Sequence, residues 1–227
     1  MKQRLGTDPP TLLVGAVRGL ESETPALRAA LEDFAPQEVA LSLSEDELAS
    51  LRRYFPPEGP EPLVPLSPSE MGYARGLCRF GEVRVPSPSF LLALTWAEAR
   101  HLPVRSLDPG DEHYSELYVR NIGYFDLLRR NRSERSLARA PPVRPDAESY
   151  AVEWEARLGR SAGSRRLERA RAEFSSERIR ALRRGLGPRG RLALVVDVER
   201  FASLEPALGL SGADAPLPSE VPRPLGD

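Results

Sequence analysis

The sequence is poor in the residues that build common metal and disulfide sites. It has one cysteine, Cys78, and two histidines, His101 and His113, among 227 residues. A single cysteine excludes an intramolecular disulfide and a zinc site built from several cysteines. Two histidines exclude a histidine-rich metal site. Because Cys78 falls in an apolar helical pattern with no histidine near it in the sequence, we expect a core residue rather than a nucleophile.

Long apolar runs and lysines are also scarce. No uninterrupted apolar stretch approaches the roughly 20 residues that span a bilayer, and the first eight residues lack the apolar region of a secretory signal. We therefore expect a cytoplasmic protein with no membrane partner. Lys2 is the only lysine, so we interpret the abundance of arginine as compositional bias. The formal net charge of -1 excludes a globally basic nucleic-acid-binding protein.

The rest of the composition and the order of apolar patterns are typical of a globular α/β protein. Hydrophobic residues make up 41% and charged residues 29% of the chain, which is typical of a folded domain. Apolar runs predict strands at Leu12–Val17 and Leu192–Asp197, alternation predicts one at Val39–Leu43, and Pro103–Asp108 is a further strand candidate. Helical patterns separate them, so we expect a mostly parallel central sheet of about four strands flanked by helices.

Local signals place the helices. Thr24-Pro25 predicts an N-cap followed by proline at the first helical position. Ser44 and Ser67 each stand three residues before a glutamate, the pattern of a capping box. The expected helices run over residues 24–34, 44–55, 67–80, 88–102, 111–130, 147–158, 165–174, 176–185 and 200–208. Residues 131–146 are polar and rich in Arg and Pro, and we expect a connection there.

These elements predict one domain over residues 1–212. An Arg-rich helical segment, 131–190, is inserted before the last strand, and residues 213–227 form a Pro-rich flexible tail. A further Pro-rich loop is expected at 56–66.

The Arg-rich region divides the charge of the chain unevenly. Residues 129–191 contain 18 arginines against 8 acidic residues. Such asymmetry is compatible with binding of an anionic polymer, or with pairing to the acidic remainder of the same chain or of a second subunit. No nucleic-acid-binding motif is present, so we expect a homodimer formed through this region. Its apolar contacts would come from Leu158, Leu167, Phe174 and Leu182.

Polar residues stand where the predicted strands end. Gly15 and Arg18 close Thr11-Leu-Leu-Val-Gly-Ala-Val-Arg18, and Ser42 follows the second run. Asp108 ends the third strand in Leu107-Asp108. The fourth strand ends at Asp197, with Glu199 just beyond. Because the carboxyl ends of parallel strands meet at one edge of a sheet, we expect these residues to cluster there.

These motifs, with Glu177-Arg178 at a helix start, resemble the TraB/TIKI family, also called the pheromone-shutdown family. The resemblance implies the α/β fold and, from some members, metal-dependent peptidase activity. It matches Gly15 and Leu107-Asp108, but it implies a histidine where Arg18 stands, a glutamate where Ser42 stands and a histidine after the last strand. Arginine stays protonated and cannot ligate a metal. The resemblance therefore implies a degenerate member with no catalytic residue, metal or cofactor.

The resemblance also implies a vestigial pocket. Its residues are Gly15, Arg18, Ser42, Asp108, Glu177, Arg178, Asp197 and Glu199. Three alternatives stay open. In the first, ion pairs between Arg18 and the acids fill the pocket. In the second, the pocket binds a small anionic ligand or a protein. In the third, the chain is a hydrolase of peptides or small molecules that uses Asp108, Glu177, Asp197 and Glu199. We expect a binding or regulatory role.

The two histidines give weaker signals. His113 stands near Asp108, Glu112 and Glu116, which together have the donor atoms for a metal ion. Acidic residues at a helix start are, however, expected from the helix dipole alone. His101 precedes a proline at a helix end, where the dipole also favours it.

Overall fold

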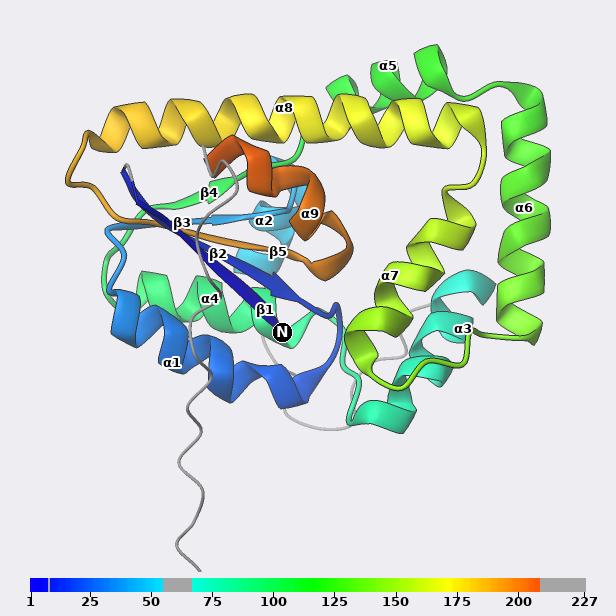
Figure 1. Cartoon of the computed structure of the whole chain (residues 1–227), viewed down its shortest axis with the longest axis horizontal. Coiled ribbons are helices and arrows are strands. Elements are labelled where there is room, and N and C mark those ends of the chain that lie inside the picture. Colours follow the sequence, from blue (N-terminus) through cyan, green and yellow to red (C-terminus); the bar gives the residue numbers. More distant parts are fainter. Residues whose placement is uncertain (8, 55–66, 209–227) are drawn as a thin grey trace, which may run out of the picture.

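A computed structural model describes residues 1–7, 9–54 and 67–208 (Figure 1). Over these ranges the central sheet has five strands in the order β1-β2-β5-β3-β4. The strands are β1 Lys2–Thr7, β2 Pro10–Ala16, β3 Glu38–Leu41, β4 Val104–Ser106 and β5 Leu192–Asp197. β2, β5, β3 and β4 run parallel, while β1 pairs antiparallel with β2.

The α/β class and the four predicted strands are therefore confirmed, whereas the expected sheet was wrong in one respect. It is a mixed sheet of five strands over the described residues, because β1 adds an antiparallel edge. The sequence of β1, Lys-Gln-Arg-Leu-Gly-Thr, carries too little apolar alternation to predict a strand. Edge strands tolerate such polar residues because one side of the strand faces solvent.

Alternate residues of the strands pack into two different hydrophobic cores, one on each face of the sheet. Leu12 and Val14 of β2 pack on one face of the sheet and Leu13 packs on the other. Helices α1 (Thr24–Phe34) and α4 (Pro88–Glu98) cover the first face, and α8 (Ala162–Leu186) crosses the second (Figure 1). Both faces of β2, β3 and β5 are thus buried, as is typical of α/β sheets, whereas Arg105 of the edge strand β4 is exposed.

The remaining helices complete the described part. They are α2 Glu45–Arg52, α3 Pro68–Leu77, α5 Asp111–Asn121, α6 Tyr124–Arg139, α7 Ala147–Leu158 and α9 Phe201–Leu204, with 3₁₀ turns η1 Glu21–Glu23, η2 Cys78–Phe80, η3 Val198–Arg200 and η4 Glu205–Leu208. Both capping boxes are confirmed, with Ser44 Oγ accepting from the Glu47 amide at 3.1 Å. The N-cap of α1 is Glu23, not Thr24, whose hydroxyl donates to the Glu21 carbonyl at 2.9 Å.

A third core lies beyond the end of the sheet, among α3, α6 and α7. Its buried residues include Leu77, Leu137, Tyr150 and Trp154. The Tyr150 hydroxyl donates to the Tyr73 carbonyl at 3.0 Å, which links α7 to α3. This packing holds α7 beside the carboxyl ends of the strands.

The helical segment differs from the sequence prediction in three places. The helix expected over 111–130 is two helices, because Gly123 caps α6 and donates its amide to Asp126 Oδ2 at 3.1 Å. α6 continues to Arg139, so most of the expected connection at 131–146 is helical. The helices expected at 165–174 and 176–185 form one continuous α8. Asp126 also accepts from the Gly163 amide at 3.2 Å and so ties α6 to α8.

The core assignment of Cys78 was wrong, since the thiol is exposed. Cys78 lies in η2, just past the end of α3, and its neighbour Leu77 takes the buried position. The expected loop at 56–66 and the expected tail at 213–227 lie outside the described residues. None of the helices within the described ranges is long and apolar enough to cross a membrane.

The apolar side chains assigned to a dimer contact are used within one chain. Leu158 and Leu167 are buried, and Leu182 packs against the core under α8. Part of the charge asymmetry is also satisfied internally, because Arg171 pairs with Asp108 and Arg178 with Glu45. Self-association itself stays a prediction, and it needs another surface.

Candidate functional site

The carboxyl ends of the parallel strands border a polar cavity of about 390 Å³. Of the eight residues expected in a pocket, it brings together Arg18, Ser42, Asp108, Asp197 and Glu199. Its lining is completed by Ser44, Glu47, Pro109, Asp111, Tyr114, Arg130, Glu155, Glu168, Arg171 and Arg200. The clustering follows from the sheet, because β2, β5, β3 and β4 all end at this edge.

Asp197, at the end of β5, is held by Arg18 and Ser42. Arg18 Nε and Nη2 donate to the two carboxylate oxygens at 3.1 and 2.6 Å. Ser42 Oγ accepts from the Asp197 amide at 3.1 Å and donates to Oδ2 at 3.4 Å. The Asp197 side chain is 2% exposed whereas that of Arg18 is 58% exposed. Arg18 therefore covers a buried carboxylate, and its own side chain lines the cavity.

Gly15 supports this edge without lining the cavity. A Cβ atom at Gly15 would lie 2.8 Å from Phe201 Cδ2, so glycine permits the ring to pack directly on β2. The residue expected from the family motif thus has a packing role in this chain.

Asp108, after β4, is held by two arginines from distant parts of the chain. Arg200 Nη1 donates to Oδ1, and Arg171 Nη2 donates to Oδ2 at 2.9 Å. Ser175 Oγ donates to Oδ1 at 3.3 Å. Burial alone would raise the pKa of Asp108, but Arg200 and Arg171 outweigh it, and the pKa lies below its ordinary value.

Arg171, Ser175 and Arg200 were not predicted from the sequence. They stand 63, 67 and 92 residues after Asp108. The i, i+4 spacing of Arg171 and Ser175 on α8 is the one signal that they share a helix face.

Glu199 is the least satisfied acid of the cavity. Its Oε2 atom is buried and has no hydrogen-bond partner among the described residues. Burial and the charge of Asp197 raise the pKa of Glu199 to about 8. Glu155 of α7, which sequence reasoning missed, also lines the cavity and has an exposed side chain.

Glu177 and Arg178 are not brought into this cavity. Glu177 is exposed on α8. Arg178 Nη2 donates to Glu45 Oε1 at 3.0 Å and its Nε to the Ser106 carbonyl at 3.3 Å, so it ties α8 to α2 and β4.

The acids of the site are not arranged as metal ligands. Within residues 1–7, 9–54 and 67–208, no three His, Cys, Asp or Glu side chains lie close enough together to hold a metal ion. His113 stacks on Phe174 with ring centroids 5.3 Å apart, and its Nδ1 lies 3.8 Å from Glu116 Oε2. It does not join Asp108, whose oxygens are occupied by arginines.

A second, more apolar cavity of about 880 Å³ adjoins the first. The two share Arg18, Glu47, Asp111, Arg130, Glu155 and Glu199. The apolar lining of the second includes Leu43, Leu51, Tyr54, Tyr73, Val83, Phe90, Trp154 and Leu158. We name the two cavities together the strand-end cleft. It has a charged end over the strands and an apolar end between α2, α3, α4 and α7.

Comparison with known proteins adds no relative. No protein-family model matches the chain, and no curated protein matches it. The TraB/TIKI resemblance therefore stays a prediction drawn from the strand-end motifs.

Proposed function

We propose that this chain is a TraB/TIKI-like binding protein that has lost metal-dependent hydrolysis. One observation carries the proposal: the aspartates at the strand ends are already paired with arginines. Arg18 holds Asp197 through two hydrogen bonds, and Arg171 and Arg200 hold Asp108. A metal ion would have to displace these charge-assisted pairs and lie beside guanidinium groups.

The open space beside these ion pairs supports a ligand-binding site rather than a former site that side chains fill. The charged cavity retains about 390 Å³, which lies within the range of roughly 300–1,000 Å³ that small-molecule sites occupy. Arg18 lines that space. The strand-end cleft thus offers fixed charges and apolar walls without an assembled metal site.

A thermal-shift screen tests this proposal. Small metabolites, short peptides and the chlorides of Mn, Co and Zn are added singly to the protein. A binder present at 100 times its Kd stabilises the fold by about 2.7 kcal/mol. We expect an organic hit whose effect changes in Arg18→Ala, which removes a charge from the cleft, and stays unchanged in Arg52→Ala, a matched change in an exposed ion pair of α2. Equal effects in both variants would place binding outside the cleft.

Hydrolysis is the alternative, and Glu199 favours it. A carboxyl whose pKa is about 8, next to a carboxylate paired with arginine, resembles an acid–base pair with separated roles. Glu177 and Asp108 no longer support this alternative, because Glu177 is remote and Asp108 is occupied. Turnover of a peptide or ester panel that disappears in Glu199→Gln would establish the hydrolase and reject the binding proposal.

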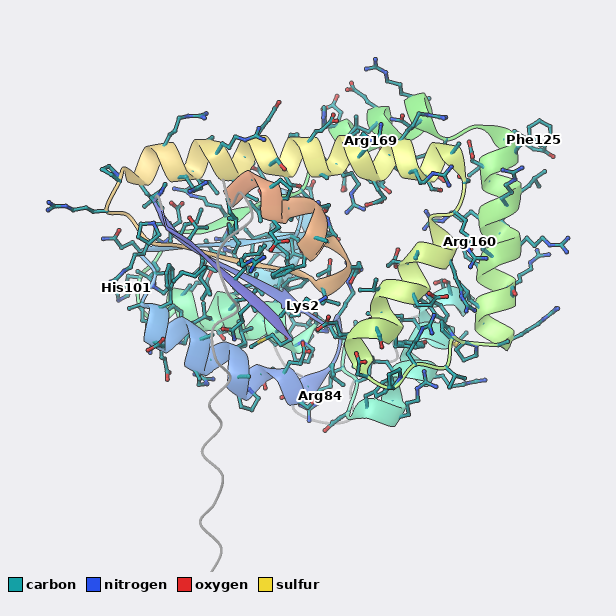
Figure 2. The ribbon with its side chains drawn as sticks, in the orientation of Figure 1. Lys2, Arg84, His101, Phe125, Arg160 and Arg169 are labelled. Carbon is teal, nitrogen blue, oxygen red and sulfur yellow. The ribbon has the colours of Figure 1, made fainter. Side chains whose placement is uncertain are left out.

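A second candidate function rests on the outer face of α6. Helical spacing places on one face the exposed side chains of Tyr124, Phe125, Leu128, Arg129, Arg132, Arg135 and Arg139. Neither acid of α6 shares this face: Asp126 binds the Gly163 amide and Glu134 binds Arg130. Phe125 is 77% exposed and projects from the corner where α5 meets α6 (Figure 2).

The α6 face differs from the outer face of α8. On α8 the exposed arginines alternate with Glu173 and Glu177, which is typical of a solvated surface. Exposed aromatic residues next to arginines are instead typical of protein interfaces. We therefore propose that the α6 face binds an acidic protein segment with apolar anchors, and a second copy of the chain is one source of such a segment.

Fluorescence anisotropy tests the second candidate. The probes are a labelled Glu-rich peptide that contains Phe and Leu, and a single-stranded oligonucleotide of equal charge. Arg129→Glu with Arg132→Glu should abolish peptide binding, whereas Arg166→Glu with Arg169→Glu on α8 should not. Stronger binding of the oligonucleotide would reject a protein partner. Light scattering at low and high salt shows whether the same variants alter self-association.

A further inference from the structure

We propose that the strand-end cleft binds a ligand that carries a positively charged amine on an apolar, aromatic body. The inference rests on the proposed binding function and names its ligand class. The amine would lie where the two cavities meet, beside Glu155 and Glu199, and the body would occupy the apolar cavity.

The charge balance of the lining favours a cation. The lining of the charged cavity has seven acids and four arginines. The acids are Glu47, Asp108, Asp111, Glu155, Glu168, Asp197 and Glu199, and the arginines are Arg18, Arg130, Arg171 and Arg200. Each arginine is already engaged by an acid of the chain. Arg18 alone suggests an anion from the sequence, but an anion in this cleft would meet the excess of carboxylates.

Four of these acids have no arginine partner among the described residues, and one of them, Glu47, instead accepts from the Ser44 amide at 2.8 Å in the capping box of α2. Glu155 and Glu199 form no ion pair within the described part of the chain, and both line both cavities. Buried Oε2 of Glu199 also lacks a hydrogen bond. An unsatisfied buried acceptor destabilises the protein, and an ammonium group would remove that cost by donating to it.

The apolar cavity supplies the other half of the site. Tyr54, Tyr73, Phe90 and Trp154 line it. Tyr73 and Trp154 pack edge to face with ring centroids 5.6 Å apart. Such an aromatic wall next to carboxylates favours an organic cation, because ring faces attract positive charge. A simple metal cation would leave the apolar cavity unused.

Proton linkage gives the proposal a distinctive signature. Burial is the main cause of the raised pKa of Glu199; the charges of Asp197 and Glu155 raise the pKa further, and Arg18 opposes them. Tyr73 of α3 also faces this cluster. With a pKa of about 8, most Glu199 carboxyls are protonated at pH 7. A bound ammonium favours the carboxylate, so binding should release a proton and strengthen as pH rises from 6 to 8.

Isothermal titration calorimetry with three probes tests the ligand class. The probes are 2-phenylethylamine, 2-phenylethanol and 3-phenylpropionate, which share the aromatic body and differ in charge. We expect the amine to bind at least about tenfold more tightly than the others, a difference of roughly 1.4 kcal/mol. Titration in buffers of different ionisation heat measures the released proton.

Two variants and one control show whether amine binding depends on the acids of the cleft. Glu199→Gln should weaken amine binding at least about tenfold and abolish proton release, and Glu155→Gln tests the second acid independently. Glu177→Gln is the matched control, since Glu177 is an exposed glutamate outside the cleft. Thermal melts establish that each variant is folded.

The outcomes separate this inference from the proposed function. Tightest binding of the propionate or the alcohol overturns the amine class but leaves a binding cleft. Absence of binding by all three probes also overturns the amine class. Stoichiometric binding of Mn, Co or Zn instead rejects the proposed function itself.

Discussion

The ion pairs around Asp108 give the sharpest stability prediction. Asp108→Asn keeps the shape of the side chain and removes its charge. The Arg200 side chain, 8% exposed, then loses its counterion, and the Arg171 side chain, 21% exposed, keeps only its ion pair with Glu168. Removal of one partner from a buried ion pair costs about 3–5 kcal/mol. For a domain of this size we expect Tm to fall by roughly 6–20 °C, at about 2–4 °C per kcal/mol.

Urea unfolding of matched variants measures this cost. The control is Glu98→Gln, which breaks the Arg52–Glu98 pair between side chains that are 44% and 47% exposed. Exposed pairs contribute about 0–1 kcal/mol, so the control should unfold close to the unmodified protein. Equal, small losses in the two variants would refute the view that Asp108 anchors a buried charge network.

The pH dependence of Asp108→Asn checks the same reasoning. The pKa of Asp108 is lowered in the folded protein, so the ionised carboxylate stabilises the fold above the unfolded pKa of about 3.9. That stability is lost as pH falls through the folded pKa. The difference between the unmodified protein and the variant should therefore be full at pH 6–7 and shrink at strongly acidic pH. A difference that persists unchanged in acid would show that the charge is not its source.

Three further predictions follow from single residues. The pKa of Glu199 is raised to about 8, so the folded protein loses stability as pH rises from about 4.3 toward 8. The Tm of Glu199→Gln relative to the unmodified protein should therefore rise over that pH range. A Tm difference that does not change with pH would contradict the burial of Glu199. Cys78 is exposed, so a thiol reagent such as DTNB should label it in the native protein without denaturant. A thiol that reacts only after unfolding would show that Cys78 is buried. A Cβ at Gly76 would collide with the Tyr150 hydroxyl, so Gly76→Ala should cost about 1–3 kcal/mol in urea unfolding, and a neutral result would contradict the close approach of α3 and α7.

Sequence reasoning succeeded where short-range chemistry decides the structure. Both capping boxes depend on residues three positions apart, and Ser44 and Ser67 form them as predicted. The strands β2 and β5 are largely continuous apolar runs buried on both faces, so their residue types alone identify them. The strand-end position of Arg18 and Asp197 followed from parallel topology.

Sequence reasoning failed where distant contacts decide. β1 is a strand because β2 offers it an edge, not because its own residues alternate. The break between α5 and α6 depends on Asp126, whose carboxylate serves both Gly123 and Gly163. The partners of Asp108 come from α8 and η3, and no local pattern joins them to β4. The exposed position of Cys78 likewise reflects which face of the α3 end meets α7.

We propose that the arginine-paired aspartates leave no metal site in the strand-end cleft. Elemental analysis tests it most directly, on protein expressed with added Mn, Co and Zn and dialysed without chelator. We expect a content well below one transition metal per chain for the unmodified protein. A stable equivalent of Mn, Co or Zn that is lost in Asp197→Asn would contradict it, because it would show that the carboxylate held by Arg18 ligates a metal.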